Sequence, residues 1–594
     1  MTFAIAPSSS TTTVFDLTSP VGPLPYIPDD LTCTQFLLDH RHPARPYNKF
    51  SNPWLVEEAT GRQVGCEEAR ARAWGLANAL SSRWKIGEDD VVCVFSANHI
   101  DWPIAIWATH RLGGIVTGAN PAYTPDELSY QLNITRTKLL ITHSSSLSVA
   151  LAAARNSGIP EDHIVLIDSQ PIAAGSKLYP TVETLVQEGL KIAPTFVERR
   201  LAPGEGRTKL ALLNFSSGTT GTPKAVAIPH YAVIANTIQM AFHDRAAEDY
   251  TTWEKRRTRT GDAVYAVLPM YHVYGILITL QHYIFVGYTL VISSKFNLVN
   301  MLKSIERYRI NHLLTAPPMV VQMCKNPVVK QYDLSSVRFM MCSAAPLSAE
   351  LTQQLIELLP QIEIHQGYGM TETSSVVTWP RTDKKYGSLG SGGQIMPGVT
   401  MRVVKEDGTL AKLGESGELY VKTPAMALGY FNNEEATRET FINGWVRTGD
   451  IVYFNDEGEV FVIDRIKELM KVKGFQVAPA ELEGHLFTNP LVGDTCVVPI
   501  PDEYSGEVPL AFVVPSKTAL DRVKKCPEEA DTIKAEIVKF VADNKVYYKR
   551  LAGGVEFIDA IPRNPSGKLL RRVLREKARE LKKAQAATQT KAKL

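Results

Sequence analysis

The residues best suited to chemistry lie together between positions 216 and 224. In order they are Ser216, Ser217, Gly218, Thr219, Thr220, Gly221, Thr222, Pro223 and Lys224. Backbone amides and hydroxyl groups can donate to phosphate oxygens, glycine permits close approach of the backbone to a ligand, and lysine adds a positive charge. The segment is not a Walker loop, because proline replaces its second glycine and alanine follows the lysine. An apolar run, 210–213, precedes it, so the pattern predicts a strand that opens into a phosphate-binding loop.

Six further motifs follow this loop in a fixed order. They are 268–272 (LPMYH), 344–347 (AAPL), 366–372 (QGYGMTE), 447–450 (RTGD), 464–476 (DRIKELMKVKGFQ) and 562–568 (PRNPSGK). Together the seven motifs resemble those of the adenylate-forming superfamily, which contains acyl- and aryl-CoA ligases, peptide-synthetase adenylation domains and beetle luciferases. The resemblance covers nearly the whole chain after its first forty or so residues. It is closest to the branch of 4-coumarate–CoA ligases and fungal acyl-CoA ligases.

The resemblance implies an acid–thiol ligase that depends on ATP and Mg²⁺. Such an enzyme converts a carboxylic acid to acyl-AMP and then to acyl-CoA, with ATP, Mg²⁺ and coenzyme A as cofactors and with AMP and pyrophosphate as products. A freestanding adenylation enzyme that loads a carrier protein and a luciferase-like oxygenase are the alternatives, because they share these motifs. A pseudo-enzyme that only binds partners is disfavoured by the intact Lys568, Glu372 and Asp450.

The resemblance also assigns the nucleotide contacts. Tyr368 is expected to stack on adenine, Thr371 to bond the α-phosphate, and Asp450 to accept from the ribose hydroxyls with Arg465 assisting. Glu372 offers the hard carboxylate oxygen that Mg²⁺ prefers. The expected cofactor contacts are Ser216, Ser217, Gly218, Thr219, Thr220, Gly221, Lys224, Lys295, Ala344, Gln366, Gly367, Tyr368, Thr371, Asp450, Arg465, Lys467 and Gly474.

Two groups of residues near the C-terminus are expected to serve the two half-reactions. Lys568 lies in a Pro-Ser-Gly loop that we expect to open the last helix, where amides and the helix dipole favour an anion, and the resemblance makes it the adenylation lysine. Lys471, Lys473 and Gln476 are expected to act with CoA after a rotation about Lys467. The resemblance further assigns Lys295 to CoA and makes His272 a gate to the acyl pocket.

The expected acyl pocket departs from that of plant coumarate ligases at two positions. Its residues are Tyr274, Ile278, Ser343, Gly367 and Met370. Ile278 stands where those enzymes tend to have a small polar residue, and Ser343 replaces the usual glycine. Both departures favour an apolar fatty acid or an unhydroxylated aryl acid over a hydroxycinnamate.

Composition places the chain among ordinary globular proteins of several domains. A chain of 594 residues is too long to fold around one hydrophobic core, and 44% of its residues are hydrophobic. Because 64 basic residues nearly balance 62 acidic ones, no nucleic-acid partner is expected. The seven cysteines are odd in number and include no C-x-x-C pair, which favours a reducing compartment. The apolar stretch 273–292 is read as a buried helix and strand and not as a membrane span.

Alternating apolar runs and helical patterns predict an α/β fold with parallel or mixed sheets. Examples are the strands 91–95 and 138–142 and the helix 102–112. We expect a Ser-, Thr- and Pro-rich extension over 1–45, on the surface or mobile, an adenylation domain over 46–464, and a small mobile α+β lid over 465–594. The charged insertion 252–262 is expected to be an exposed loop.

The last three residues, Ala592, Lys593 and Leu594, resemble the Ser-Lys-Leu peroxisomal address. The N-terminus lacks the basic start and apolar region of a secretory signal. These features predict a peroxisomal location and binding to the import receptor. The alternative is a solvated Lys- and Ala-rich tail on a cytoplasmic protein.

Overall fold

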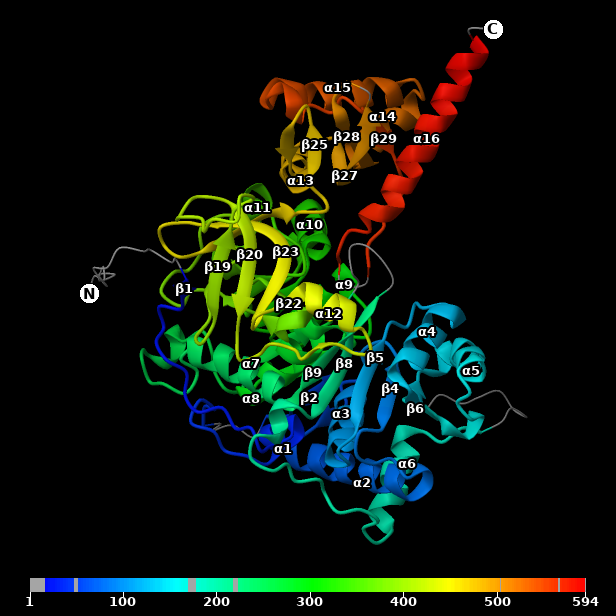
Figure 1. Ribbon diagram of the computed structural model, residues 1–594, viewed down its shortest axis with the longest axis vertical. Coiled ribbons are helices and arrows are strands. Elements are labelled where there is room, and N and C mark those ends of the chain that lie inside the picture. Colours follow the sequence, from blue (N-terminus) through cyan, green and yellow to red (C-terminus); the bar gives the residue numbers. More distant parts are fainter. Residues whose placement is uncertain are drawn as a thin grey trace.

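The computed structural model in Figure 1 has a large body and a small domain above it. It describes residues 16–47, 52–168, 178–216, 223–502, 504–564 and 567–592, with backbone alone for 583–592. The body contains two seven-stranded sheets with helices packed on them and a six-stranded sheet, and the small domain has a sheet of its own. This arrangement confirms the predicted α/β class.

The first sheet carries the strand that leads into the phosphate-loop segment. Its order is β21 (Gly429–Tyr430), β9 (Lys224–Pro229), β8 (Leu210–Ser216), β5 (Ile115–Ala119), β4 (Val91–Phe95), β6 (Thr137–Thr142) and β7 (Ile164–Leu166). β4 is buried on both faces. Val92 and Val94 pack in the core formed with α2 (Cys66–Trp84) and α3 (Trp102–Arg111), while Cys93 and Phe95 pack in the core formed with α4 (Pro125–Thr135) and α5 (Leu147–Asn156). The predicted strands and helix of this region are confirmed.

The second sheet ends at the strand that leads into the Gln366 motif. Its order is β14 (Glu363–Gln366), β13 (Phe339–Cys342), β12 (His312–Thr315), β10 (Ala263–Ala266), β11 (Thr289–Ile292), β2 (Leu55–Glu57) and β3 (Gln63–Val64). All neighbours are parallel except β2 and β3. Parallel strands deliver their carboxyl ends to one edge, so the 343–347 and 366–372 motifs emerge side by side.

The stretch read as a buried helix and strand is confirmed. It forms a π-helix over Tyr274–His282, the short α8 (Tyr283–Phe285) and then β11, and all three are buried. No helix in the described part of the chain is long and apolar enough to cross a membrane.

A third, antiparallel sheet completes the body. It contains β1 (Leu17–Thr18), β19 (Thr400–Val404), β20 (Gly417–Lys422), β22 (Phe441–Ile442), β23 (Trp445–Phe454) and β24 (Val460–Arg465). Alternate residues of β19 and β20 are buried, as expected of strands with one face on the core. The sheet matters for the site because its last two strands form the hairpin that carries Asp450 and Arg465.

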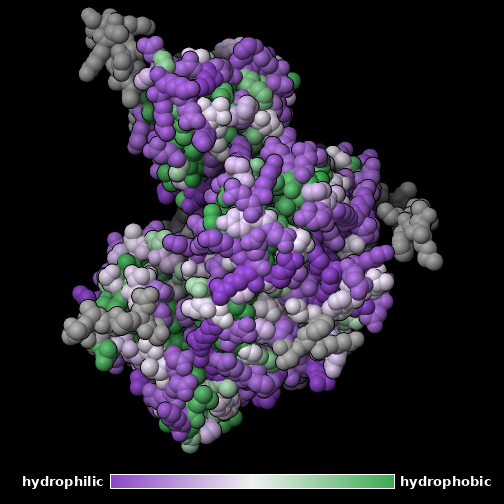
Figure 2. Space-filling view, turned by 180° about the vertical axis from the view of Figure 1, so that it is seen from behind, coloured by the Kyte–Doolittle hydropathy of each residue, from purple (hydrophilic) through white to green (hydrophobic). Residues whose placement is uncertain are grey.

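The small domain, called the lid below, begins after this hairpin. It contains β25 (Met470–Val472), β26 (Phe475–Val477), β27 (Val492–Asp502), β28 (Gly506–Pro515), β29 (Val555–Phe557), α13 (Pro479–Phe487), α14 (Lys517–Lys525), α15 (Glu529–Asn544) and α16 (Arg571–Ala592). Val462 packs on the core of the body, whereas Met470 belongs to the core of the lid, so the chain passes from one to the other within eight residues. Figure 2 shows the lid as a separate lobe whose surface, like that of the body, is mostly hydrophilic.

Two expectations about local structure near the ends of the chain are wrong. Lys568 does not open the last helix, because α16 starts three residues later at Arg571 and the loop instead makes an Arg563–Leu569 bridge. The first 45 residues are not confined to the surface, since α1 (Cys33–Leu38) is fully buried. The Cys33 thiol lies 2.9 Å from His230 Nδ1, which ties α1 to the first turn of α7 (His230–His243).

The insertion 252–262, expected to be an exposed loop, is exposed at 252–255 and at Gly261, but Arg257, Thr258 and Thr260 are buried. Arg257 is buried, and its guanidinium donates to Glu363 on β14 (2.9 Å), to Asp244 (3.4 Å) and to the Pro380 carbonyl (2.9 Å). These bonds satisfy a buried charge. A charged run in sequence does not reveal such burial, because the partners come from three distant segments.

Candidate active site

The β23–β24 hairpin brings together three of the predicted nucleotide residues. Its antiparallel register pairs Asp450 with Arg465, and the Asp450 Oδ1 lies 3.1 Å from the Arg465 Nε. The other oxygen of Asp450 accepts a 2.6 Å hydrogen bond from the hydroxyl of Tyr368. Burial, followed by the charge of Asp450, raises the pKa of Tyr368 well above its usual value. The Asp450 carboxylate is therefore buried and held by two donors.

Lys568 of the lid faces this hairpin. Burial, and then the positive charge of Arg465, lowers the pKa of Lys568 to about 8, although the negative charges of Glu468, Asp450 and Glu372 act in the opposite direction. On the body side, a Cβ at the neighbouring Gly567 would lie 2.9 Å from the Cβ of Ala316. The loop of the lid that carries Lys568 thus lies against the body, on the side of the predicted nucleotide-binding residues Asp450 and Glu372.

His272 lies near the same lysine. Burial, and then the positive charge of Lys568, lowers the pKa of His272 to about 4, so the imidazole is neutral near pH 7. Its Nδ1 accepts from the backbone amide of Tyr274 at 3.3 Å, which leaves Nε2 as the protonated nitrogen. An imidazole with so low a pKa is a weak base, which favours a gate over a general base.

Glu372 lies on the short helical turn Thr371–Thr373, at the end of the motif that carries Tyr368. Glu372 is 6% exposed, and its Oε1 accepts a 2.7 Å hydrogen bond from the hydroxyl of Tyr430. The Tyr430 bond leaves Oε2, the second carboxylate oxygen, available to a ligand. A buried carboxylate with one free oxygen suits a hard cation such as Mg²⁺.

Tyr430 was missed by the sequence analysis. It lies 58 residues from Glu372 and outside all seven motifs, so only its position in β21 brings it to the site. Its ring also faces Lys224, whose Nζ is 4.9 Å from the ring centroid.

The phosphate-loop segment connects two antiparallel strands. Ser216 at the end of β8 pairs with Lys224 at the start of β9. Ser217, Gly218, Thr219, Thr220 and Gly221 lie outside the described residues. Lys224 is therefore the one cation of this segment whose position is described.

The carboxyl edge of β13 and β14 carries the predicted adenine and acyl residues. Gln366 exchanges two hydrogen bonds with the backbone of Leu347, at 2.7 and 3.0 Å, and the Ser343 hydroxyl donates to the Gly367 carbonyl at 2.9 Å. Ala344 has a left-handed φ of 75°, which is unusual for a residue with a Cβ and is typical of functional sites. These bonds join the two motif loops into one rigid edge.

The predicted acyl residues on the π-helix are buried next to this edge. Tyr274 donates from its hydroxyl to the Met341 carbonyl at 3.2 Å, and Ile278 is 1% exposed. A Cβ on Gly367 would meet Met341 Sδ at 3.4 Å and Ser343 Oγ at 3.5 Å. Met370, at the end of the same loop, is half-buried.

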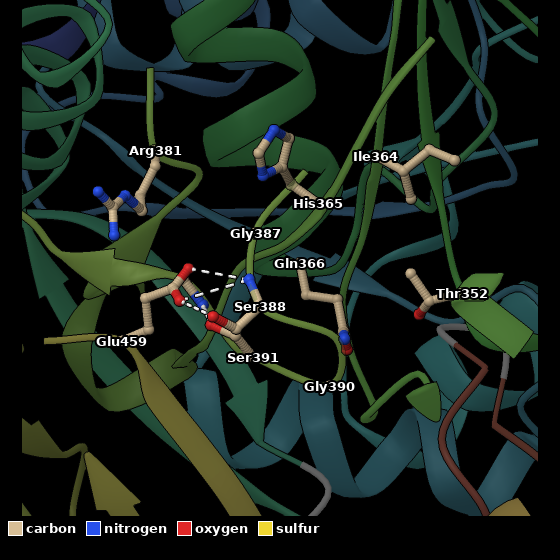
Figure 3. A pocket seen from close by; sticks show the side chains of 11 residues that line it. Thr352, Ile364, His365, Gln366, Arg381, Gly387, Ser388, Gly390, Ser391 and Glu459 are labelled. Atoms are coloured by element: carbon tan, nitrogen blue, oxygen red, sulfur yellow. Dashed lines mark hydrogen bonds between the residues drawn. The ribbon is translucent and has the colours of Figure 1, made fainter. Parts of the chain in front are cut away.

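A separate small cavity lies beside the end of β14 (Figure 3). Its lining residues are Thr352, Ile364, His365, Gln366, Arg381, Gly387, Ser388, Gly390, Ser391, Gly393 and Glu459. Glu459 accepts from the amide and the hydroxyl of Ser388, as the dashed lines in Figure 3 indicate. Except for Gln366, none of the predicted site residues lines it, so it is not the predicted acyl pocket.

The second group of predicted catalytic residues is not at this site. Lys471, Lys473, Gly474 and Gln476 are exposed on the β25–β26 hairpin of the lid. Lys473 faces other lid residues, with its Nζ 5.0 Å from the ring centroid of Tyr504 and 5.6 Å from that of Tyr547. The lid therefore offers Lys568 and not Lys473 to the body.

Lys295 and Lys467 are also exposed. Lys295 follows β11 on the body, and Lys467 lies in the turn between β24 and β25, where the chain passes between the two cores. The carbonyl of Lys467 accepts from Arg575 of α16 at 3.3 Å.

Comparison with known proteins identifies two family matches and several relatives. Residues 40–431 match the family model described as AMP-binding enzyme, and residues 481–568 match the AMP-binding enzyme C-terminal domain. The 4-coumarate–CoA ligase-like 2 of Arabidopsis thaliana is 35% identical, with 88% of this chain and 87% of the relative covered. An acyl-CoA ligase of Alternaria alternata is 32% identical over 93% and 96%. The peroxisomal OPC-8:0-CoA ligase 1 of A. thaliana is 33% identical over 95% and 96%.

Solved structures share the fold over nearly their whole length. The anthranilate CoA ligase AuaEII in complex with anthranoyl-AMP superposes with a TM-score of 0.78 at 24% identity, covering 93% of this chain and 98% of that one. ATP-bound MatB from Rhodopseudomonas palustris gives a TM-score of 0.76 at 23% identity, covering 93% and 99%. The matches confirm the fold class and the resemblance drawn from the seven motifs.

Proposed function

The chain belongs to the AMP-binding enzyme family of adenylate-forming CoA ligases, and within this family we propose the residue roles, the acid and the location given below. Its reaction uses ATP, Mg²⁺ and CoA to convert a carboxylic acid to acyl-AMP and then to the CoA thioester. The observation that carries the role assignment is the insertion of the Gly567–Lys568 loop against Ala316 of the body, where the charges of Asp450, Arg465 and Glu372 act on Lys568.

Adenylation is mostly a matter of positioning and charge. The Lys568 ammonium stabilises the negative charge that develops between the acid and the α-phosphate, and the neutral His272 controls access to the acyl pocket. Asp450 accepts hydrogen bonds from the ribose hydroxyls, and Tyr368 stacks on adenine. Gln366 and Ala344, at the carboxyl edge of β13 and β14, also contact the nucleotide. Lys224 contacts the outer phosphates.

Glu372 is the proposed ligand of Mg²⁺. Its second carboxylate oxygen is available to the cation, which would neutralise phosphate charge when it is bound. For the second half-reaction, rotation about Lys467 replaces Lys568 by Lys471, Lys473, Gly474 and Gln476 at the body, where Lys295 contacts CoA. The exposure of this hairpin supports such a role, because residues that are exposed in one position of the lid can contact the body and CoA in another.

The proposed acid has an apolar tail. The hydroxyls of Tyr274 and Ser343 are both engaged by main-chain carbonyls, and Ile278 has no polar group. These walls therefore hold no spare donor for a ring hydroxyl. A medium- or long-chain fatty acid or an unhydroxylated aryl acid fits this chemistry.

Pyrophosphate release measured across a panel of fatty and aryl acids, with ATP and with or without CoA, tests this function. We expect acid-dependent release and a thioester with CoA. Transfer to a carrier protein in preference to CoA, or oxygen uptake with light emission, would contradict the ligase assignment in favour of the carrier-loading or luciferase-like alternatives.

We also propose that the protein is peroxisomal and that the import receptor reads Ala592, Lys593 and Leu594 at the free C-terminus. One relative is named as peroxisomal, and α16 carries the end of the chain away from the lid (Figure 1). A fluorescent tag at the N-terminus should leave the protein in peroxisomes, whereas a tag after Leu594 should move it to the cytosol. Cytosolic signal from both fusions would refute the proposal.

A further inference from the structure

Tyr430 lies where the phosphate-loop strand and the Glu372 turn meet. β21 pairs with β9 so that Tyr430 opposes Val226, and the next amide, that of Phe431, donates to the Ala225 carbonyl at 2.8 Å. This ladder places Tyr430 two positions along the neighbouring strand from Lys224. The position of the tyrosine is thus set by main-chain pairing.

The hydroxyl of Tyr430 occupies one oxygen of Glu372. The bond is 2.7 Å long, and the backbone of Glu372 is also tied to the same segment, because the amide of Ala427 donates to the Glu372 carbonyl at 2.9 Å. Glu372 is therefore fixed at both its main chain and its side chain. The bond from Tyr430 engages Oε1 and leaves Oε2 available to a ligand.

The ring of Tyr430 faces Lys224. The distance from Nζ to the ring centroid, 4.9 Å, is within the range of a cation–π contact. One side chain thus touches both a carboxylate and an ammonium group that come from segments about 150 residues apart, and it sets the separation between them.

We propose that Tyr430 is a positioning residue that restricts Glu372 to ligation through a single oxygen and thereby favours Mg²⁺ over larger cations. Mg²⁺ takes near-ideal octahedral geometry at about 2.0–2.1 Å, whereas Ca²⁺ takes more ligands at longer distances and readily accepts both oxygens of one carboxylate. A carboxylate oxygen that accepts a hydrogen bond from a phenol has one lone pair engaged and is a poorer metal ligand, so bidentate binding is disfavoured. This inference rests on the proposed role of Glu372 as the metal ligand.

The hydroxyl and the ring have separable tasks. The hydroxyl controls Glu372 and so the choice of cation, whereas the ring holds the ammonium of Lys224 toward the phosphates. Tyr430→Phe removes the first task and retains the second. Tyr430→Leu removes both.

The test is calorimetric binding of ATP to the full-length protein with Mg²⁺, with Ca²⁺, or with EDTA. For Tyr430→Phe we expect weaker binding with Mg²⁺ and unchanged or tighter binding with Ca²⁺, so that the ratio of the two affinities falls about fivefold or more, as for the loss of a hydrogen bond to a charged group. For Tyr430→Leu we expect, in addition, severalfold weaker binding of ATP in EDTA. Tyr386→Phe is the matched control, because its hydroxyl bonds only to the Pro360 carbonyl, and it should change neither value.

A Tyr430→Phe protein with the wild-type Mg²⁺/Ca²⁺ ratio overturns the inference, as does an equal loss of ATP affinity with both cations. Glu372→Gln separates this failure from failure of the proposed function. If Glu372→Gln loses the metal dependence of ATP binding while Tyr430→Phe keeps the ratio, Glu372 remains the ligand and only the role of Tyr430 is wrong. If Glu372→Gln keeps its metal dependence, the proposed ligand itself is wrong.

Discussion

Replacing Lys568 by alanine should remove adenylation and spare the second half-reaction. The ammonium faces Asp450, Arg465 and Glu372 from a loop of the lid, whereas the hairpin of Lys473 is turned away. Loss of one well-placed charge in a buried site costs about 3 kcal/mol or more, which is a rate decrease of about a hundredfold or greater. Formation of the thioester from supplied acyl-AMP should stay near the wild-type rate.

The pKa of Lys568, lowered to about 8, adds a dependence on pH. The lysine is about nine-tenths charged near pH 7 and about nine-tenths neutral near pH 9, so adenylation should decline as the pH rises through this interval. Bound phosphates favour the ammonium and raise its pKa. The decline in kcat should therefore occur at higher pH than the decline in kcat/KM.

The assay is pyrophosphate release without CoA, measured across this pH interval for the wild type, Lys568→Ala and Lys568→Arg. Arginine stays charged throughout, so Lys568→Arg should retain part of the activity and lose the decline near pH 8. Pyrophosphate release by Lys568→Ala near the wild-type rate would refute the catalytic role. An unchanged decline in Lys568→Arg would assign the titration to another group.

Three further predictions concern the hinge, the body and the pocket. Lys467→Pro fixes φ at the proposed pivot, so acyl-AMP should still form while CoA transfer collapses, and equal loss of both steps would contradict the hinge. Arg257→Met leaves buried Asp244 and half-buried Glu363 without the Arg257 charge and should lower the unfolding free energy by about 3 kcal/mol or more in denaturant titrations. Arg259→Met is the control: the Arg259 guanidinium bonds carbonyls of its own loop, so its loss should cost less than about 1 kcal/mol. Ile278→Ser and Ser343→Gly should each raise kcat/KM for coumarate severalfold relative to cinnamate and to a medium-chain fatty acid. Ile278→Ser supplies a polar partner worth about 1 kcal/mol, and Ser343→Gly adds space. Unchanged ratios would contradict the pocket assignment.

Much of the chemistry could be predicted from local sequence. Residue types and spacing alone indicate a phosphate loop between a strand and a lysine, and β8 and Lys224 occupy these places. The length of apolar runs and the helical pattern correctly predicted β4, α3 and the buried segment after Val273, because a strand buried on both faces is a short continuous apolar run. The identity of Asp450 and Tyr368 as site residues followed from the motifs, and the structure brings them into direct contact.

The partners of these residues were decided by tertiary structure alone. Tyr430 reaches Glu372 and Lys224 only because β21 pairs with β9, and Arg257 is buried only because three distant segments close around it. The choice of Lys568 over Lys473 at the site depends on how the whole lid sits on the body. Local sequence determines which side chains are available and how they repeat along an element. Which of them meet depends on strand register and domain packing, and these are set by many weak contacts between residues far apart in the chain.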